Sequence, residues 1–164
     1  MNVRAEYEYR DGGGTVFLRD VVVRASTGTL QAMTRSITAA CEDIGTHHPV
    51  FIPRQVGLPE PYSWVEGPHI RAKDMRRFPI WPDIDHCWAG FTGLERTTAK
   101  HTDARTLTEL VEAFESAGAA GWEIFDPYSE FPELYLGFSA DDPPTKAAAR
   151  RVRQLFGRLA SPRM

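Results

Sequence analysis

The stretch from His48 to Pro61, with the sequence HPVFIPRQVGLPEP, constrains the fold of this chain more than any other segment. Proline fixes φ, lacks an amide donor and disfavours the α region for the residue before it, so a segment with four prolines must be extended or turned. Because proline is rare in central strands, we expect a short strand over Val50–Ile52 that leaves the sheet at Pro53. Val56 and Leu58 are expected to pack beyond this kink.

The composition is that of an ordinary globular protein. The chain has 164 residues, of which 42% are hydrophobic and 25% are charged, and its net charge is -3. This charge gives no general attraction to nucleic acid or to an anionic membrane. The N-terminus lacks an apolar leader and no apolar run approaches membrane-spanning length. We therefore expect a single domain spanning 1–164, located in the cytoplasm and not bound to a membrane.

Alternating residues predict a hairpin at the N-terminus. Apolar side chains recur at every second position from Val3 to Tyr9, between charged ones, which is typical of a half-buried strand. Three glycines at 12–14 favour a tight turn, and Val16–Val23 then predicts a second strand that is apolar on both faces.

Helical spacing predicts three helices. The first follows a cap at Ser26 or Thr27 and ends at Gly45; the second opens with a capping box of Thr106 and Glu109 and is closed by Gly118. The third lies in the C-terminal part, from about 143 onwards. The apolar stripe of the first helix comprises Leu30, Met33, Ile37, Cys41 and Ile44, and that of the second comprises Leu107, Leu110, Val111, Phe114 and Ala117.

The order of these elements predicts the fold class. Cys87–Thr98 indicates an irregular strand in which Gly90 and Gly93 mark a bulge or a close backbone approach. The resulting β-β-α-β-β-α order predicts an α+β fold, with an antiparallel sheet, helices on one of its faces and an additional C-terminal helix. A proline- and aromatic-rich excursion at 59–84 and a C-terminal extension at 119–164 complete the domain.

A polar cluster at 83–87 is one candidate site. If this segment is extended, Asp83 and Asp85 share one face with Cys87 while His86 lies on the other, so the side chains do not converge. The chain has no CxxC, HxxxH or G-x-S-x-G pattern, and Cys41 and Cys87 are interpreted as buried thiols. We therefore predict no catalytic residue, metal or cofactor, and keep an enzyme centred on Asp85 and His86 as an alternative.

The excursion is the other candidate site. Basic residues alternate there with aromatic ones, a combination that can hold an acidic protein surface or a nucleic acid strand. A solvated loop anchored by its aromatic side chains is an equally good interpretation. The predicted partner-binding residues are Trp64, Arg71, Lys73, Arg76, Arg77, Phe78 and Trp81.

Three motifs give the chain a resemblance to a family of small bacterial proteins. The motifs are the run at 7–11, the run at 51–59 and the run at 85–91, and they resemble the order YRYRD, FIPxQVGLP and DHxWHxF. Ala89 stands where the family has a second histidine. The family has no established activity, so the resemblance implies a fold and supplies no mechanism.

These observations favour a binding protein over an enzyme. We expect a non-enzymatic module that contacts a protein partner, in the manner of small inhibitors or immunity proteins. The alternatives are the enzyme described above, acting on a small molecule or depending on a metal, and a protein that binds single-stranded nucleic acid through 71–81.

Overall fold

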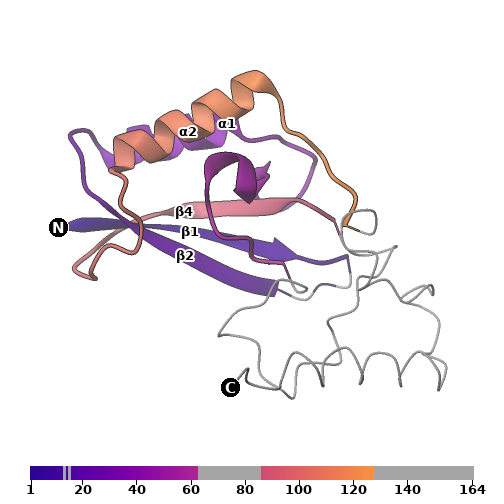
Figure 1. Ribbon diagram of the computed structural model, residues 1–164, viewed down its shortest axis with the longest axis horizontal. Coiled ribbons are helices and arrows are strands. Elements are labelled where there is room, and N and C mark those ends of the chain that lie inside the picture. The colour runs from indigo at the N-terminus through magenta and orange to yellow at the C-terminus, as the bar shows by residue number, and fades with distance from the viewer. Residues whose placement is uncertain (13, 15, 63–85, 128–164) are drawn as a thin grey trace, which may run out of the picture. The chain divides into compact units, whose positions relative to one another are not determined.

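The computed structural model describes residues 1–12, 14, 16–62 and 86–127 (Figure 1). They form an α+β fold with a four-stranded antiparallel sheet and two α-helices, as predicted. In chain order the elements are β1 (Asn2–Arg10), β2 (Val16–Arg24), α1 (Leu30–Ala40), β3 (Val50–Phe51), the 3-10 helix η1 (Pro53–Val56), β4 (Ala89–Thr97) and α2 (Leu107–Ala120).

The chain divides into two compact units. The first comprises Met1–Arg10, Gly14–Tyr62 and Cys87–Ile124, and holds all of these elements. The second comprises Asp11–Gly13, Ser63–His86 and Phe125–Met164, most of which lies outside the described residues. The single-domain interpretation is not tested by this division and stays a prediction.

The sheet has the strand order β2-β1-β4-β3, so β1 lies in its middle and β2 lies at one edge. β1 and β2 pair without interruption from Asn2 opposite Arg24 to Arg10 opposite Val16. Between β1 and β4 the register shifts at Glu6 and Tyr7, next to Gly93. This irregularity is the predicted bulge, and Gly93 has a positive φ of 154° there.

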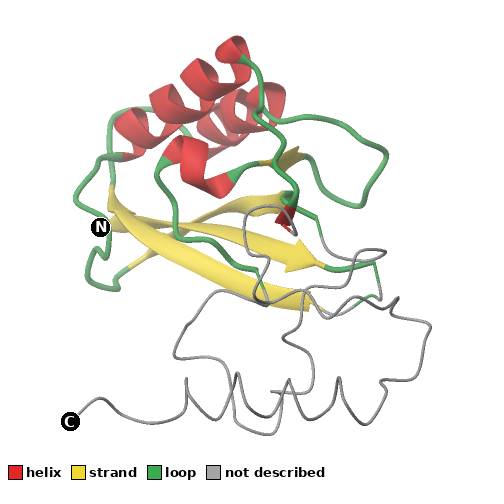
Figure 2. Cartoon of the chain, turned by 45° about the vertical axis from the view of Figure 1, so that its right-hand side comes forward, coloured by secondary structure: helices red, strands yellow, loops and turns green. Residues whose placement is uncertain are grey.

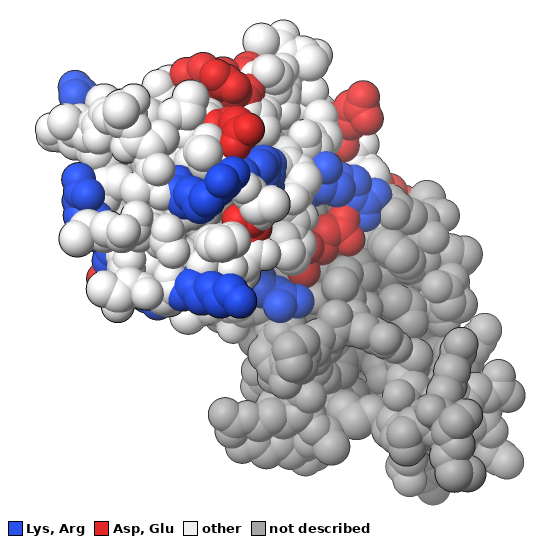
Figure 3. Space-filling model, turned by 60° about the vertical axis from the view of Figure 1, so that its left-hand side comes forward, with Lys and Arg blue, Asp and Glu red and all other residues white. Residues whose placement is uncertain are grey.

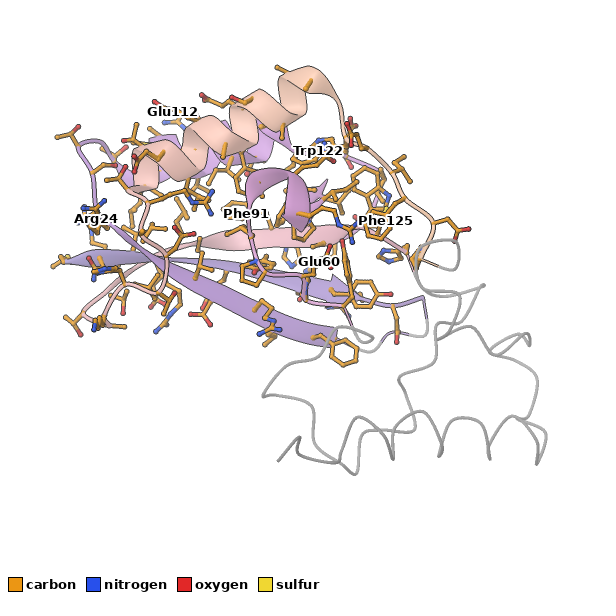
Figure 4. The ribbon with its side chains drawn as sticks, viewed as in Figure 1. Arg24, Glu60, Phe91, Glu112, Trp122 and Phe125 are labelled. Carbon is orange, nitrogen blue, oxygen red and sulfur yellow. The ribbon has the colours of Figure 1, made fainter. Side chains whose placement is uncertain are left out.

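Both α-helices and η1 cover the same face of the sheet (Figures 1 and 2). The alternation predicted for β1 places Val3, Ala5, Tyr7 and Tyr9 under this cover, where all four are buried. Figure 4 shows Phe91 of β4 pointing from the sheet toward the helices, whereas Glu112 lies on the outer side of α2. The helix face of the sheet is therefore the core face, and the opposite face is called the open face below.

The first helix begins and ends differently from the prediction. Its N-cap is Thr29, whose hydroxyl accepts a hydrogen bond from the Ala32 amide, and not Ser26 or Thr27. The hydroxyl of Ser26 instead contacts Thr108 at the start of α2. α1 ends at Ala40, so Ile44 is exposed and does not belong to the apolar stripe. Two or three neighbouring hydroxyls can each cap a helix, and tertiary contacts decide which one does.

The capping box of α2 is present as predicted, and all five residues of its predicted stripe are buried. Its predicted end at Gly118 is wrong, because the helix continues to Ala120 and Gly121 is the C-cap. Gly118 serves a different purpose. A Cβ atom at this position would lie 2.4 Å from the carbonyl oxygen of Ala40, so the absence of a side chain allows α1 and α2 to approach closely.

The proline-rich stretch folds as predicted. Val50 and Phe51 pair with β4, and the chain then leaves the sheet at Pro53, the first residue of η1. Val56 and Leu58 are both buried beyond this kink. The third predicted helix and the C-terminal strand-like run at 134–138 lie outside the described residues. Neither described α-helix has the length and apolarity needed to span a membrane.

Candidate functional site

Most of the sequence-predicted site residues lie outside the described residues. This applies to every residue of the partner-binding set and to Asp83 and Asp85 of the polar cluster. His86 is described and half-buried, and Cys87 after it is buried. The binding role of the excursion and the polar cluster therefore stay predictions.

The motif at 51–59 builds architecture. The side-chain amide of Gln55 donates to the carbonyl of Gly121 at 3.2 Å and accepts from the amide of Glu123 at 2.8 Å, as a strand neighbour would. Arg54 forms an ion pair with Glu60 six residues later. Each polar side chain of the motif is thus engaged within the fold.

Arg105 completes this architecture from the loop before α2. Its guanidinium donates to the carbonyls of Val56 at 2.7 Å and Gly57 at 3.1 Å, which lie at the C-terminal end of η1. It also contacts the carboxylate of Asp103 at 2.6 Å. Hydrogen bonds from the Arg105 side chain lower the pKa of Asp103, against a smaller opposing effect of burial. Arg105, Asp103, Val56 and Gly57 are called the clasp below.

Two tyrosines hold the segment after η1. Tyr7 donates from its hydroxyl to the carbonyl of Pro59 at 2.7 Å, and burial raises the pKa of this hydroxyl far above its usual range. Tyr62 donates to the carbonyl of Cys87. The Tyr7 hydroxyl is not suited to proton transfer near neutral pH, because its deprotonation would leave a charge in the core and break a hydrogen bond.

The open face carries one buried carboxylate. Glu8 of β1 is 8% exposed and is the one buried charged residue among those described. Its Oε1 accepts from Arg10 at 3.1 and 3.2 Å, and Nε2 of His48 lies 4.0 Å from the same oxygen. Gly90 leaves room for both side chains, since a Cβ there would lie 3.1 Å from that of His48.

This cluster has the geometry of an ion pair and not of a catalytic dyad. A separation of 4.0 Å is too long for a hydrogen bond between His48 and Glu8. Arg10 already neutralises the carboxylate. No group of three or more His, Cys, Asp or Glu side chains within the described ranges is placed to bind a metal ion. The cluster therefore gives no support of its own to an enzymatic function.

The outer edge of β2 is divided into two halves. In its C-terminal half, the amide and carbonyl of Val22 bond to Thr102 and Asp103, and the amide of Arg24 donates to the carbonyl of Arg105. In an antiparallel pair, successive residues direct their amide and carbonyl groups alternately toward and away from the neighbouring strand. The bonds of Val22 and Arg24 therefore show that the even-numbered residues of β2 direct these groups away from β1. The loop before α2 thus seals the edge from Val22 onwards.

The N-terminal half of this edge is open. Val16, Leu18 and Asp20 have the same parity as Val22, so their amides and carbonyls also point outward, and no hydrogen bond to them is found from any described residue outside the strand. Leu18 is 71% exposed and Val16 is 36% exposed. Val16–Asp20 is called the free edge below, and it combines unpaired backbone groups with exposed apolar side chains.

Arg19 lies within the free edge, but its side chain is on the other face of the sheet from those of Val16 and Leu18. It lies opposite Tyr7 in the register and therefore belongs to the core face. Its Nε atom is buried and is the one such side-chain atom without a hydrogen-bond partner among the described residues. Leaving a buried donor unpaired costs about 1–3 kcal/mol, so the described residues leave the hydrogen-bonding capacity of this guanidinium incompletely used.

Charges on the described part of the molecule are mixed. In Figure 3, the Lys and Arg side chains are interspersed with Asp and Glu side chains on the face shown. On the open face, for example, Arg4 lies between Asp20 at 3.4 Å and Glu95 at 3.3 Å. Nucleic acid requires a continuous basic surface, and the face shown does not supply one.

The free edge was not predicted from the sequence. The pattern of Val16–Val23 predicts a strand that is apolar on both faces, and this strand is present as β2, with Val16 and Leu18 exposed. The signal available was the pairing of β2 with β1 in a hairpin, which leaves the second side of one strand unoccupied unless another strand joins it.

Comparisons of the chain with protein-family models, with curated proteins and with solved structures gave no match. The resemblance to the small bacterial family therefore stays a prediction.

Proposed function

We propose that this protein is a protein-binding module that holds an extended segment of its partner against the free edge of β2. A strand added at a sheet edge gains main-chain hydrogen bonds, and the side chains that alternate along it provide specificity. The partner segment would continue the sheet beyond β2, with apolar side chains covering Val16 and Leu18.

One observation supports this proposal above the others: half of the β2 edge is sealed and half is not. The loop at 102–105 bonds to Val22 and Arg24, which is how natural proteins protect an edge from unwanted pairing. Val16–Asp20 lacks this protection and adds an exposed leucine. An open edge adds no stability and invites pairing with other chains, so an open half beside a sealed half favours a role in binding.

The other functions have less support. An enzyme centred on Asp85 and His86, or nucleic acid binding through 71–81, depends on residues that lie mostly outside the described ranges. The partner-binding role that the sequence predicts for the excursion residues from Trp64 to Trp81 stays a separate prediction, because these residues lie outside the described ranges.

A peptide-display experiment on the full chain tests the proposal. Random twelve-residue peptides are selected for binding, and amide hydrogen exchange is then measured with and without a selected peptide. Strand addition slows exchange at Val16, Leu18 and Asp20, whose amides point outward, and leaves Phe17 and Arg19 largely unchanged because these already face β1.

Two matched lysine variants provide the control. Leu18→Lys places a charge in the free edge and is expected to weaken peptide binding at least tenfold. Ile44→Lys makes the same change at another exposed aliphatic residue, which lies between α1 and β3, and is expected to leave binding unchanged. Selection of peptides that bind both variants equally, or that leave the three outward amides unprotected, would contradict the proposal.

A further inference from the structure

Arg19 is the basic residue of the free edge. It is half-buried, and its Nε has no hydrogen-bond partner among the described residues. Asp20, its neighbour in the sequence, faces the open side and pairs with Arg4, while Asp103 is bonded to Arg105 in the clasp. Within the part of the chain that the structure describes, the free edge therefore presents a cation without a carboxylate partner.

We infer that the partner segment carries an aspartate or glutamate opposite Arg19, followed at the next and third positions by apolar residues. This inference rests on the proposed function. In antiparallel pairing, the residue after the acid lies opposite Leu18 and the third residue after it lies opposite Val16. The segment would thus read acid, apolar, any residue, apolar, from its N-terminus.

The antiparallel direction agrees with the rest of the sheet. All three pairings between named strands are antiparallel, and antiparallel pairs are the more common kind in proteins. The acid and the two apolar residues would lie on opposite faces of the added strand. The acid would contact Arg19 on the helix face, and the apolar residues would cover Leu18 and Val16 on the open face.

A second copy of this chain fits the edge less well. When two β2 strands pair antiparallel through their outward groups, an odd-numbered residue lies opposite another odd-numbered residue. The residues available opposite Arg19 are then Phe17, Val21 and Arg19 itself. None is acidic and the last one repels. Charge complementarity therefore favours a different, acidic segment over self-association.

Display selection with a charge-reversed variant tests this inference. Peptides selected on the wild-type full chain are expected to be enriched in Asp or Glu one residue before an alternating apolar pair. Selection on Arg19→Glu is expected to replace this acid with Lys or Arg at the same position. For one selected peptide, changing its acid to the matching amide should weaken binding to the wild-type chain about tenfold.

The outcomes separate the inference from the proposed function. The variant Arg19→Gln shows by circular dichroism and thermal unfolding whether the side chain is needed for folding, and its binding should not respond to the acid-to-amide change. Peptides that require Leu18 but show no acid preference, or no change of preference with Arg19→Glu, overturn the inference and leave strand addition intact. If no selected peptide depends on Leu18, the proposed function and the inference both fail.

Discussion

Two arginines, Arg105 in the clasp and Arg19 in the free edge, illustrate two kinds of region. The guanidinium of Arg105 is engaged by one carboxylate and two carbonyls. Arg19 has a buried nitrogen with no hydrogen-bond partner among the described residues. The clasp joins segments about fifty residues apart, whereas the free edge joins nothing among the described residues beyond β1.

We expect the clasp to contribute to stability and propose that the free edge contributes to binding. The motif that is most distinctive in sequence, at 51–59, belongs to the region that is internally satisfied. The residues proposed to bind a partner are Val16, Leu18 and Arg19 of β2, which belong to no distinctive sequence motif. Substitutions in the clasp should therefore change the free energy of unfolding, and substitutions in the free edge should change binding while leaving that free energy nearly constant.

Arg105→Ala is expected to have the largest effect on stability. It leaves the carbonyls of Val56 and Gly57 without this donor and the Asp103 carboxylate with only the backbone amide of residue 105, and it should lower the free energy of unfolding by about 2–3 kcal/mol. Urea unfolding measures this loss. Arg96→Ala is the control, because Arg96 is exposed and its contact with Met1 Sδ is 3.6 Å long, and it should change stability by less than about 0.5 kcal/mol. Equal effects of the two substitutions would show that the clasp is not stabilising.

Gly118→Ala should have the next largest effect. Its new Cβ would meet the carbonyl oxygen of Ala40 at 2.4 Å and force α1 and α2 apart. We expect a loss of about 1–3 kcal/mol, even though alanine is the better helix former by up to about 1 kcal/mol. Trp122 donates from its indole to the same carbonyl, so its fluorescence should report the displacement.

Ser116→Ala is the matched control on the exposed side of α2, and it should leave stability unchanged or slightly increased. A stabilised Gly118→Ala variant with an unchanged Trp122 spectrum would show that the two helices can separate at no cost.

The pH dependence of stability tests the clasp from its acidic side. Arg105 holds the pKa of Asp103 below its ordinary value of 3.8, so the unfolded chain binds this proton more readily than the folded one. The contribution of the pair is therefore present above that pH and is lost as the pH falls through the folded-state value. The stability difference between the wild-type chain and Asp103→Asn should narrow as the pH falls below about 3.8. A constant difference would contradict the assigned ion pair.

Leu18→Lys should have the smallest effect on stability. Because Leu18 is 71% exposed, we expect a change within about 0.5 kcal/mol in urea unfolding. The same variant should lose peptide binding, as described above. A destabilisation larger than about 1 kcal/mol would mean that Leu18 is part of the folded core, and the distinction between the two regions would fail.

The local parts of the fold could be predicted from sequence, and the parts decided by distant segments could not. The capping box at Thr106 and the alternation from Val3 to Tyr9 are signals contained within a few residues. The predicted cap of α1 at Ser26 is wrong because the Ser26 hydroxyl contacts Thr108 instead. The predicted end of α2 at Gly118 is wrong because this glycine makes room for the carbonyl of Ala40 and does not end the helix.

The candidate site illustrates the same limit more strongly. A strand pattern gives the faces of β2, but only the strand order shows that β2 is at an edge. Only the bonds between the loop at 102–105 and Val22 show where this edge is sealed. Nothing in the sequence distinguishes Arg19 from other charged residues, and only the structure shows that its Nε is buried without a hydrogen-bond partner among the described residues.

The opposite edge of the sheet has a consequence for assembly. β3 is only two residues long, and Val50 exchanges two hydrogen bonds of 2.8 Å with Glu42, which occupies its outer side. Unlimited growth of a sheet from molecule to molecule needs an acceptor strand at both borders, and here one border is terminated by the chain itself. If a guest strand binds next to β2 as proposed, it would be roughly 17 Å long at about 3.3 Å per residue. Within the described residues the other border of the sheet is closed at β3, so such docking would add one strand and would not continue into a fibre.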